Sequence, residues 1–255
     1  MKISIITVCY NSERFISTAI ESVLNQTYED IEYVIVDGMS KDSTLNIIQS
    51  YEPKFNGRMK WVSEKDKGLY DAMNKGVRMA TGDVIGLINS DDLLCDNEAV
   101  EKVMKVFNNK PSLDSVYADL FYVAQSDTNK IVRRWVTGEQ KPFRYGWHPA
   151  HPTFYIKKDV YEKYGYFNLD YRLAADFEIM LRFLDKYKIS TTYLAEPLVK
   201  MRLGGETNKS LKNIYKQNVE CIRAFTENGL KVNSLLYPMY RTLPKLLQFK
   251  KSKNE

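Results

Sequence analysis

The chain has 255 residues, 44% of them hydrophobic, which is enough to bury the core of one large α/β domain. Its three cysteines are scattered and it has only two histidines, which argues against a disulfide framework and a structural zinc site. The net charge is +5, but residues 207–255 carry eight Lys and two Arg against three Glu. The rest is therefore slightly acidic, a balance that does not favour nucleic-acid binding.

Apolar, β-branched runs alternate with segments of helical periodicity in the first 110 residues. The runs predict strands over 3–8, 33–36, 60–62 and 84–88. The segments between them predict helices over 15–24, 45–51, 69–80 and 98–107. This alternation predicts an α/β fold, Rossmann-like, in which a mostly parallel central sheet carries helices on both faces.

The alternation loosens after residue 110. Two strands are predicted over 115–124 and 131–136, as a small antiparallel extension of the sheet. Residues 176–186 predict a helix, and C-terminal helices are expected from Leu211 onward, interrupted by Pro238 and Pro244. The first apolar run is too short for a signal peptide and no run of 18 apolar residues occurs, so we expect a cytoplasmic protein.

Polar residues follow several predicted strands, at the sheet edge where ligands bind in folds of this kind. The strand ends carry Thr7 to Asn11, Asp37, and the run Asn89-Ser90-Asp91-Asp92. Paired carboxylates in such a place can hold Mg²⁺ or Mn²⁺, which prefer oxygen ligands. The alternative role for a Ser-Asp-Asp run is a helix N-cap, and for Asp37 it is a turn residue.

Motifs of competing enzyme classes are missing. No Gly-x-Gly-x-x-Gly follows the first strand, and no Gly-x-x-x-x-Gly-Lys-Ser/Thr occurs anywhere. A Gly-x-Ser-x-Gly elbow is absent too. Dehydrogenases, P-loop enzymes and many hydrolases are therefore disfavoured.

Two long stretches resemble the family-two glycosyltransferases of the GT-A fold. They read SIITVCYNSERFISTAIESVLNQTYEDIEYVIVDGMSKDST and EKDKGLYDAMNKGVRMATGDVIGLINSDD. A later stretch, HPTFYIKKDVYEKYGYFNLDYRLAADFEIMLRF, resembles the acceptor half of the bacterial members. The resemblance implies a glycosyltransferase domain over 1–205, with a nucleotide-sugar half at 1–110 and an acceptor half at 111–205. Residues 206–255 would form a basic helical appendage.

The resemblance implies a nucleotide-sugar donor, with a UDP-sugar favoured, and a set of residues that bind it. These are Thr7, Cys9, Tyr10, Asn11, Asp37, Asp66, Gly68, Asn89, Ser90 and Arg202. Asp37 would accept a hydrogen bond from the base. Arg202 would belong to a mobile loop that closes over the phosphates, for which a surface salt bridge is the alternative.

Asp91 would hold the Mg²⁺ or Mn²⁺ that bridges the donor diphosphate and stabilises the leaving group, with Asp92 as support. The family usually has Asp at the place of Asn89. Asn keeps a carbonyl ligand but loses a charge, so weaker metal binding or lost catalysis is an alternative.

Asp176 matches the position of the base that deprotonates the acceptor hydroxyl in an inverting transfer, with Glu178 as the second candidate. A helix N-cap is the alternative role for Asp176. His151 would lie near the acceptor or the diphosphate, although a structural role is equally compatible with the sequence.

The expected activity is inverting transfer of one sugar to a glycan or lipid-linked acceptor in surface polysaccharide assembly. The C-terminal leucines, aromatics and cations are compatible with contact at the inner face of a membrane, or with a helix docked on the body. A nucleotidyltransferase is a rival class, but residues 7–12 lack the Gly and Lys that it needs. A binding protein that has lost catalysis is the other rival.

Overall fold

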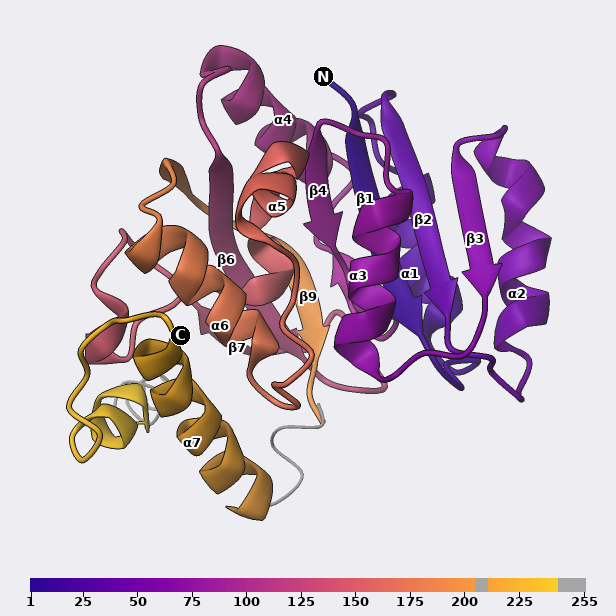
Figure 1. Cartoon of the computed structure of the whole chain (residues 1–255). Coiled ribbons are helices and arrows are strands. Elements are labelled where there is room, and N and C mark those ends of the chain that lie inside the picture. The colour runs from indigo at the N-terminus through magenta and orange to yellow at the C-terminus, as the bar shows by residue number, and fades with distance from the viewer. Residues whose placement is uncertain (205–210, 243–255) are drawn as a thin grey trace.

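The computed structural model describes residues 1–204 and 211–242 (Figure 1). The strands are β1 (Ile3–Cys9), β2 (Ile31–Asp37), β3 (Met59–Ser63), β4 (Val84–Leu87), β5 (Leu93–Leu94), β6 (Ser115–Val123), β7 (Ile131–Trp135), β8 (Tyr155–Lys157) and β9 (Thr191–Arg202). The helices are α1 (Ile16–Leu24), α2 (Thr44–Tyr51), α3 (Leu69–Met79), α4 (Ala99–Asn109), α5 (Lys158–Tyr164), α6 (Ala175–Leu181) and α7 (Leu211–Glu227). Short helical turns are η1 (Glu52–Phe55), η2 (Phe143–Tyr145), η3 (His151–Thr153) and the π-helical η4 (Arg182–Lys186).

Within the described ranges the strands form one sheet in the order β3-β2-β1-β4-β8-β6-β9-β5, with β7 paired to β6. The first four strands in this order, β3, β2, β1 and β4, run parallel to one another. Cys9 of β1 lies opposite Asp37 of β2, which in turn lies opposite Ser63 of β3. The register therefore ends these three strands at one level, and the loops that follow them share one edge.

Both faces of the sheet are covered, as the alternation of the first half predicts. Along β1, Ile6 and Val8 pack with α3, α5, α6 and α7 in one core, whereas Ile3 and Ile5 pack with α1, α2 and α4 in the other. Figure 1 shows α3, α5 and α6 in front of the strands. The period of two along a strand produces this division, and the predicted α/β fold is confirmed.

The second half of the sheet is mixed. β8 is antiparallel to β4 and β6, and β7 is antiparallel to β6, in line with the expected antiparallel extension. β9, which the sequence pattern does not predict, runs parallel to β6 and antiparallel to β5. The pairing of β9 with β6 contains bulges between Ala118 and Leu120, where Pro197 is accommodated. That proline hid the strand.

The C-terminal helix is part of the folded body. Cys221, Ala224 and Phe225 of α7, together with Tyr237, are buried in the same core as Phe177 of α6. The expected boundary near 205 and the tail from 243 onward lie outside the described residues. None of the helices in residues 1–204 and 211–242 is long and apolar enough to cross a membrane.

Candidate active site

The loops after β1 and β2 are joined by several hydrogen bonds. The main-chain N–H of Asn11 donates to Ser40 Oγ at 2.8 Å, and Asn11 Oδ1 accepts from the N–H of Lys41 at 2.9 Å. Asn11 and Met39 have φ values of 49° and 61°, an uncommon conformation for residues with a side chain. Backbone strain of this kind is concentrated at functional sites.

Asp37 is the buried anchor of this edge. Its side chain is fully buried and accepts from Ser40 Oγ at 2.5 Å, Ser40 N at 3.1 Å and Ser63 Oγ at 2.6 Å. Cys9 Sγ lies 3.7 Å from the same carboxylate. Burial, and then the charge of Asp37, raises the pKa of Cys9, so the thiol stays protonated. Ser40 and Ser63 thus hold this carboxylate in place, and neither is among the site residues that the sequence suggests.

Thr7 differs from its neighbours at this edge. Its side chain is fully buried and Tyr33 donates a hydrogen bond to it at 3.0 Å. The alternation of β1 directs it into the body, so only its main chain can serve a ligand.

Tyr10, Gly38 and Asp66 come together beside the end of β2. A Cβ atom at Gly38 would stand 2.5 Å from Asp66 Oδ2 and 3.5 Å from the Tyr10 ring, so position 38 has no room for a side chain. Asp66 Oδ1 accepts from the N–H of Gly68 at 2.8 Å. Tyr10 is 59% exposed, so its ring offers a flat surface beside a carboxylate.

The run Asn89-Ser90-Asp91-Asp92, which follows β4, lies at the same edge of the sheet. Ser90 Oγ lies 3.0 Å from Ser12 Oγ, which joins the β4 loop to the β1 loop. Asn89 Nδ2 donates to Asp92 Oδ2 at 2.8 Å, and Asp92 is only 1% exposed. An Asp at position 89 would instead set a second negative charge against this buried carboxylate. The structure thus gives a physical reason for Asn at this position.

Arg202 forms hydrogen bonds with both Asp91 and Asp92. It ends β9, is 5% exposed, and donates through Nη1 to the main-chain carbonyl of Asp91 and through Nη2 to Thr18 at 3.2 Å. Its main-chain N–H donates to Asp92 Oδ1 at 3.2 Å. Arg202 therefore lies in a strand rather than in a loop, and residues 205–210, on which a moving loop would depend, lie outside the described residues.

Burial raises the pKa of both carboxyls of this pair. For Asp91 the positive charge of Arg202 opposes the shift, and for Asp92 the negative charge of Asp91 adds to it. Both carboxyls therefore resist ionisation more than a solvated aspartate does, although the charge of Arg202 favours the ionised form of each. Burial also lowers the pKa of Arg202, because a cation loses hydration there as well.

A hydrogen bond from Tyr70 links Asp176 to the same edge of the sheet. Tyr70 follows the Asp66–Gly68 loop in the first turn of α3, and its hydroxyl donates to Asp176 Oδ1 at 3.2 Å. The N–H of Phe177 donates to the same oxygen at 2.8 Å. Burial lowers the pKa of His151, while the nearby charge of Asp176 raises it. Because burial has the larger effect, the neutral imidazole is the favoured form of His151.

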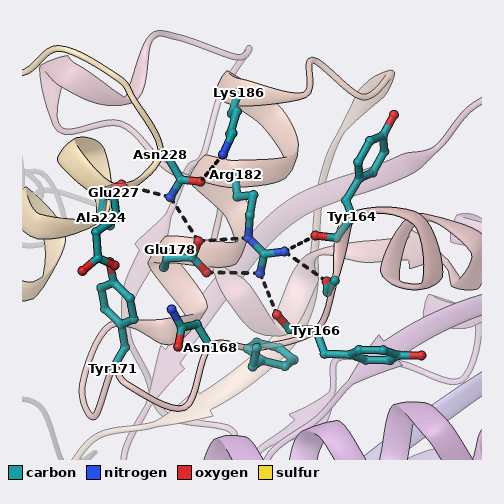
Figure 2. Close-up of polar contacts among 12 residues, drawn as sticks. Tyr164, Tyr166, Asn168, Tyr171, Glu178, Arg182, Lys186, Ala224, Glu227 and Asn228 are labelled. Atoms are coloured by element: carbon teal, nitrogen blue, oxygen red, sulfur yellow. Dashed lines mark hydrogen bonds and ion pairs between the residues drawn. The ribbon is translucent and has the colours of Figure 1, made fainter.

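Glu178 belongs to a different environment, although it is two residues away. Figure 2 shows its carboxylate between Arg182 and Asn228, with Arg182 Nε at 2.9 Å and Asn228 Nδ2 at 3.0 Å from Oε1. Arg182 also donates to the carbonyl of Tyr166 at 2.6 Å. This buried network joins α6 to the end of α7, which makes Glu178 a structural residue in the described chain.

The family model described as glycosyl transferase family 2 matches residues 4–171. The chain belongs to this family. The matched range contains Asp37, Asp66 and Asp91 and ends before Asp176. The protein is therefore a glycosyltransferase.

Related proteins agree with this assignment. A PGL/p-HBAD biosynthesis glycosyltransferase of Mycobacterium bovis is 29% identical over 192 residues, which cover 75% of this chain and 73% of that protein. Chondroitin synthase of Escherichia coli is 39% identical over 115 residues, which cover 45% of this chain and 16% of that protein.

Solved structures show the shared GT-A fold. S. aureus TarS 1–349 in complex with UDP-GlcNAc aligns with a TM-score of 0.69 at 18% identity, covering 94% of this chain and 70% of that one. The mannosyltransferase PcManGT from Pyrobaculum calidifontis, in complex with GDP-Man and Mn²⁺, aligns with a TM-score of 0.63 at 15% identity. This alignment covers 94% of this chain and 68% of the mannosyltransferase chain.

Proposed function

We propose that this glycosyltransferase transfers a sugar, with inversion, from a UDP-sugar to a glycan or lipid-linked acceptor in the assembly of a surface polysaccharide. The observation that carries the proposal is the strand-end edge itself. Asp91 and Asp92 stand there beside Arg202, and Tyr70 links Asp176 to the same edge. A solved relative of the same fold holds UDP-GlcNAc, which supports this donor class.

The nucleoside is proposed to lie against Tyr10. The exposed ring can stack on the base, and Gly38 leaves space for it. Asp37 and Asp66 are the two carboxylates that could accept from the imide N–H of uracil. Because Ser40 and Ser63 already donate to Asp37, one of these hydroxyls must turn away when the base binds there.

The oxygen donors at the strand end fit a divalent cation. Asn89 donates through its amide nitrogen and so keeps Oδ1 as an acceptor, and Asp91 bears a charge that burial disfavours. The described residues contain no group of three or more acidic, His or Cys side chains that could hold a metal by themselves. Mg²⁺ and Mn²⁺ are commonly held by one or two carboxylates together with substrate phosphates. Such an ion would supply charge stabilisation to the departing diphosphate.

Asp176 is proposed to take the proton from the acceptor hydroxyl. Tyr70 and the Phe177 N–H hold Oδ1 in place, and within the described residues only this oxygen takes part in hydrogen bonds. Oδ2 is thus the acceptor for the hydroxyl proton. A base that acts once, opposite the leaving group, produces inversion.

A thermal-shift panel tests the donor class. UDP, UDP-GlcNAc, GDP and GDP-mannose are each added with and without Mn²⁺, and a ligand that binds the folded state raises the melting temperature. We expect the uridine compounds with Mn²⁺ to give the largest shift. A larger shift with the guanosine compounds would overturn the UDP assignment, and no shift with any compound would contradict the donor site.

We also propose that the enzyme works at the inner face of the membrane. Leu235, Leu236, Met239 and Tyr240 are 84%, 41%, 53% and 39% exposed, and four lysines follow at 245–253. Apolar side chains beside cations suit an anionic lipid surface. The double variant Leu235→Glu/Met239→Glu should sediment less with anionic vesicles than Leu169→Glu, a control at another exposed leucine. Equal sedimentation of the two variants would refute membrane contact through this segment.

A further inference from the structure

The chain between α5 and α6 leads directly to the proposed base. Residues 167–174, which we call the connecting segment, contain no helix or strand. The segment ends at Ala174, the N-cap residue of α6, and alanine has no polar side chain to cap a helix. Asp176 is the second residue of α6. The position of the base therefore depends on the contacts that hold the connecting segment.

Helix α3 holds the first residue of the connecting segment. Asn74 Nδ2 donates to the carbonyl of Phe167, and Asn74 Oδ1 accepts from the N–H of Phe167, both at 2.9 Å. The Phe167 ring stacks on Tyr70 with centroids 5.7 Å apart, and it meets the His151 ring edge-on at 5.6 Å. Tyr70 and Asn74 are one turn apart on α3. This helix therefore fixes both Phe167 and the hydroxyl that donates to Asp176.

Helix α7 holds the last residues of the connecting segment through Glu220. The carboxylate accepts from the main-chain N–H of Arg172 at 3.2 Å with Oε1, and from that of Leu173 at 2.8 Å with Oε2. Gln217, three residues earlier on α7, donates to the carbonyl of Leu173 at 3.2 Å. Hydrogen bonds from main-chain N–H groups to a carboxylate are stronger than those between neutral groups. The main chain just before α6 is therefore bound to α7.

The same helix also packs against α6 itself. Phe225 of α7 lies with its ring centroid 5.9 Å from that of Phe177, the residue after Asp176. Cys221 of α7 is fully buried in the same core. Helix α7 thus contacts both the start of α6 and its buried face. It lies outside the matched range of the family model, which ends at residue 171.

The charge of Glu220 also acts on Tyr70. Burial raises the pKa of the Tyr70 phenol well above its usual value, the charge of Asp176 adds to this rise, and the charge of Glu220 adds to it as well. The phenol therefore stays protonated and donates to Asp176. Because such effects weaken with distance, Glu220 belongs to the surroundings of the Tyr70–Asp176 pair.

We propose that Glu220 is a positioning residue for the base of the transfer reaction. By holding the N–H groups of Arg172 and Leu173, it sets the start of α6. This keeps Asp176 at the Tyr70 hydroxyl. The proposal rests on the proposed function, in which Asp176 takes the acceptor proton, and it gives α7 a part in that step.

Glu220→Gln is the test variant, and Glu227→Gln is its control on the same helix. A Gln amide has one acceptor atom, so at position 220 it serves only one of the two N–H groups and turns its own NH₂ towards the other. Glu227 accepts from the Tyr171 hydroxyl at 2.5 Å (Figure 2), and a Gln oxygen can accept the same bond. Amide hydrogen exchange at Leu173 should therefore become about tenfold faster in Glu220→Gln and stay unchanged in Glu227→Gln.

His151 reports the position of Asp176 without any substrate. Burial lowers the pKa of His151, while the charge of Asp176 raises it. NMR titration of the two histidines of the chain gives this pKa, and a His148→Gln variant assigns the signals. Asp176→Asn should lower the pKa of His151, because it removes the nearby charge. Glu220→Gln should lower it too, because the released base moves away, and Glu227→Gln should leave it unchanged.

The double variant Asp176→Asn/Glu220→Gln separates positioning from a direct effect of the Glu220 charge. A residue that acts through Asp176 has no further effect on the His151 pKa once Asp176→Asn is present. The same shift in both backgrounds, equal effects of the variants at 220 and 227, or no shift with Asp176→Asn would overturn the proposal. A rise of the His151 pKa in Glu220→Gln, towards the ordinary 6.5 that unfolding restores, would overturn it as well.

The turnover of Asp176→Asn tests the proposed function separately. Full activity of that variant would remove Asp176 as the base, whatever the histidine titration shows. Loss of activity together with an unchanged His151 pKa in Glu220→Gln would leave the base in place and reject Glu220 as the residue that positions it.

Discussion

Glu32 and Asp92 are buried carboxylates at opposite ends of the same parallel strands. Glu32, at the amino end, is 2% exposed and accepts from Ser4 at 2.6 Å, Lys60 at 2.6 Å and Thr81 at 2.7 and 2.8 Å. Burial would raise the pKa of Glu32, but these donors outweigh it and lower the pKa to about 2. Burial of Asp92, at the carboxyl end, raises its pKa instead.

The two ends differ in where the compensating charge comes from. At the amino end the chain supplies it, from Lys60 and also from Lys2 at 3.6 Å. At the carboxyl end Arg202 donates to the main-chain carbonyl of Asp91, and its positive charge does not offset the effect of burial on the pKa of Asp91. A buried charge that the fold leaves uncompensated indicates a place where a ligand completes the site.

Removal of Asp176 is expected to have the largest effect on the functional end. Asp176→Asn should lower kcat by about 10²–10⁴-fold, because the amide cannot take the acceptor proton. The UDP-induced thermal shift should remain. Asp159→Asn, which alters an exposed first-turn carboxylate of α5, is the control for a helix-end effect. Full activity of the Asp176 variant would remove this residue from the mechanism.

Removal of Asp91 should separate activity from stability. Asp91→Asn is expected to lower kcat/KM by about 10²–10³-fold, because the proposed cation would lose the carboxylate that holds it near the departing diphosphate. Its melting temperature should not fall, since burial already disfavours the ionised carboxyl. Calorimetry of Mn²⁺ binding in the presence of UDP gives a readout apart from turnover. Unchanged Mn²⁺ affinity would show that Asp91 is not the ligand.

Replacement of Glu32, at the amino end of the strands, should lower stability and leave activity unchanged. Glu32→Gln is expected to lower the free energy of unfolding by about 1.5–3 kcal/mol at pH 7, because the donors around it lose a charged acceptor. The specific activity of the folded fraction should stay unchanged. Glu64→Gln, which alters a carboxylate with 53% side-chain exposure, is the control and should change stability little.

The loss at Glu32 should also depend on pH. The folded pKa of about 2 lies below the ordinary 4.5, so the contribution is present above pH 4.5 and is lost as pH falls towards 2. Urea unfolding at pH 7 and pH 3 should show a smaller difference between wild type and Glu32→Gln at the lower pH. A difference that does not shrink would mean that the charge of Glu32 is not what stabilises this end.

The sequence by itself determined the first half of the fold. Apolar runs and helical periods are local signals, and their alternation before residue 110 specifies parallel strands whose ends share an edge. That reasoning placed Asp37 and Asp91 at one edge, and the family resemblance added Asp66. The structure joins the loops after β1, β2 and β4 through Ser40 and Ser90, and it places Asp66 beside Gly38.

Only the tertiary structure determined the partners of Asp176 and Glu178, which lie two positions apart in the sequence. Asp176 and Glu178 share one short helix, but the first meets Tyr70 across 106 positions of sequence and the second meets Asn228 across 50. β9 pairs with β6 across a bulge at Pro197. This pairing brings the Arg202 guanidinium within hydrogen-bond distance of the main-chain carbonyl of Asp91. Long-range packing chooses these partners, and no local period records it.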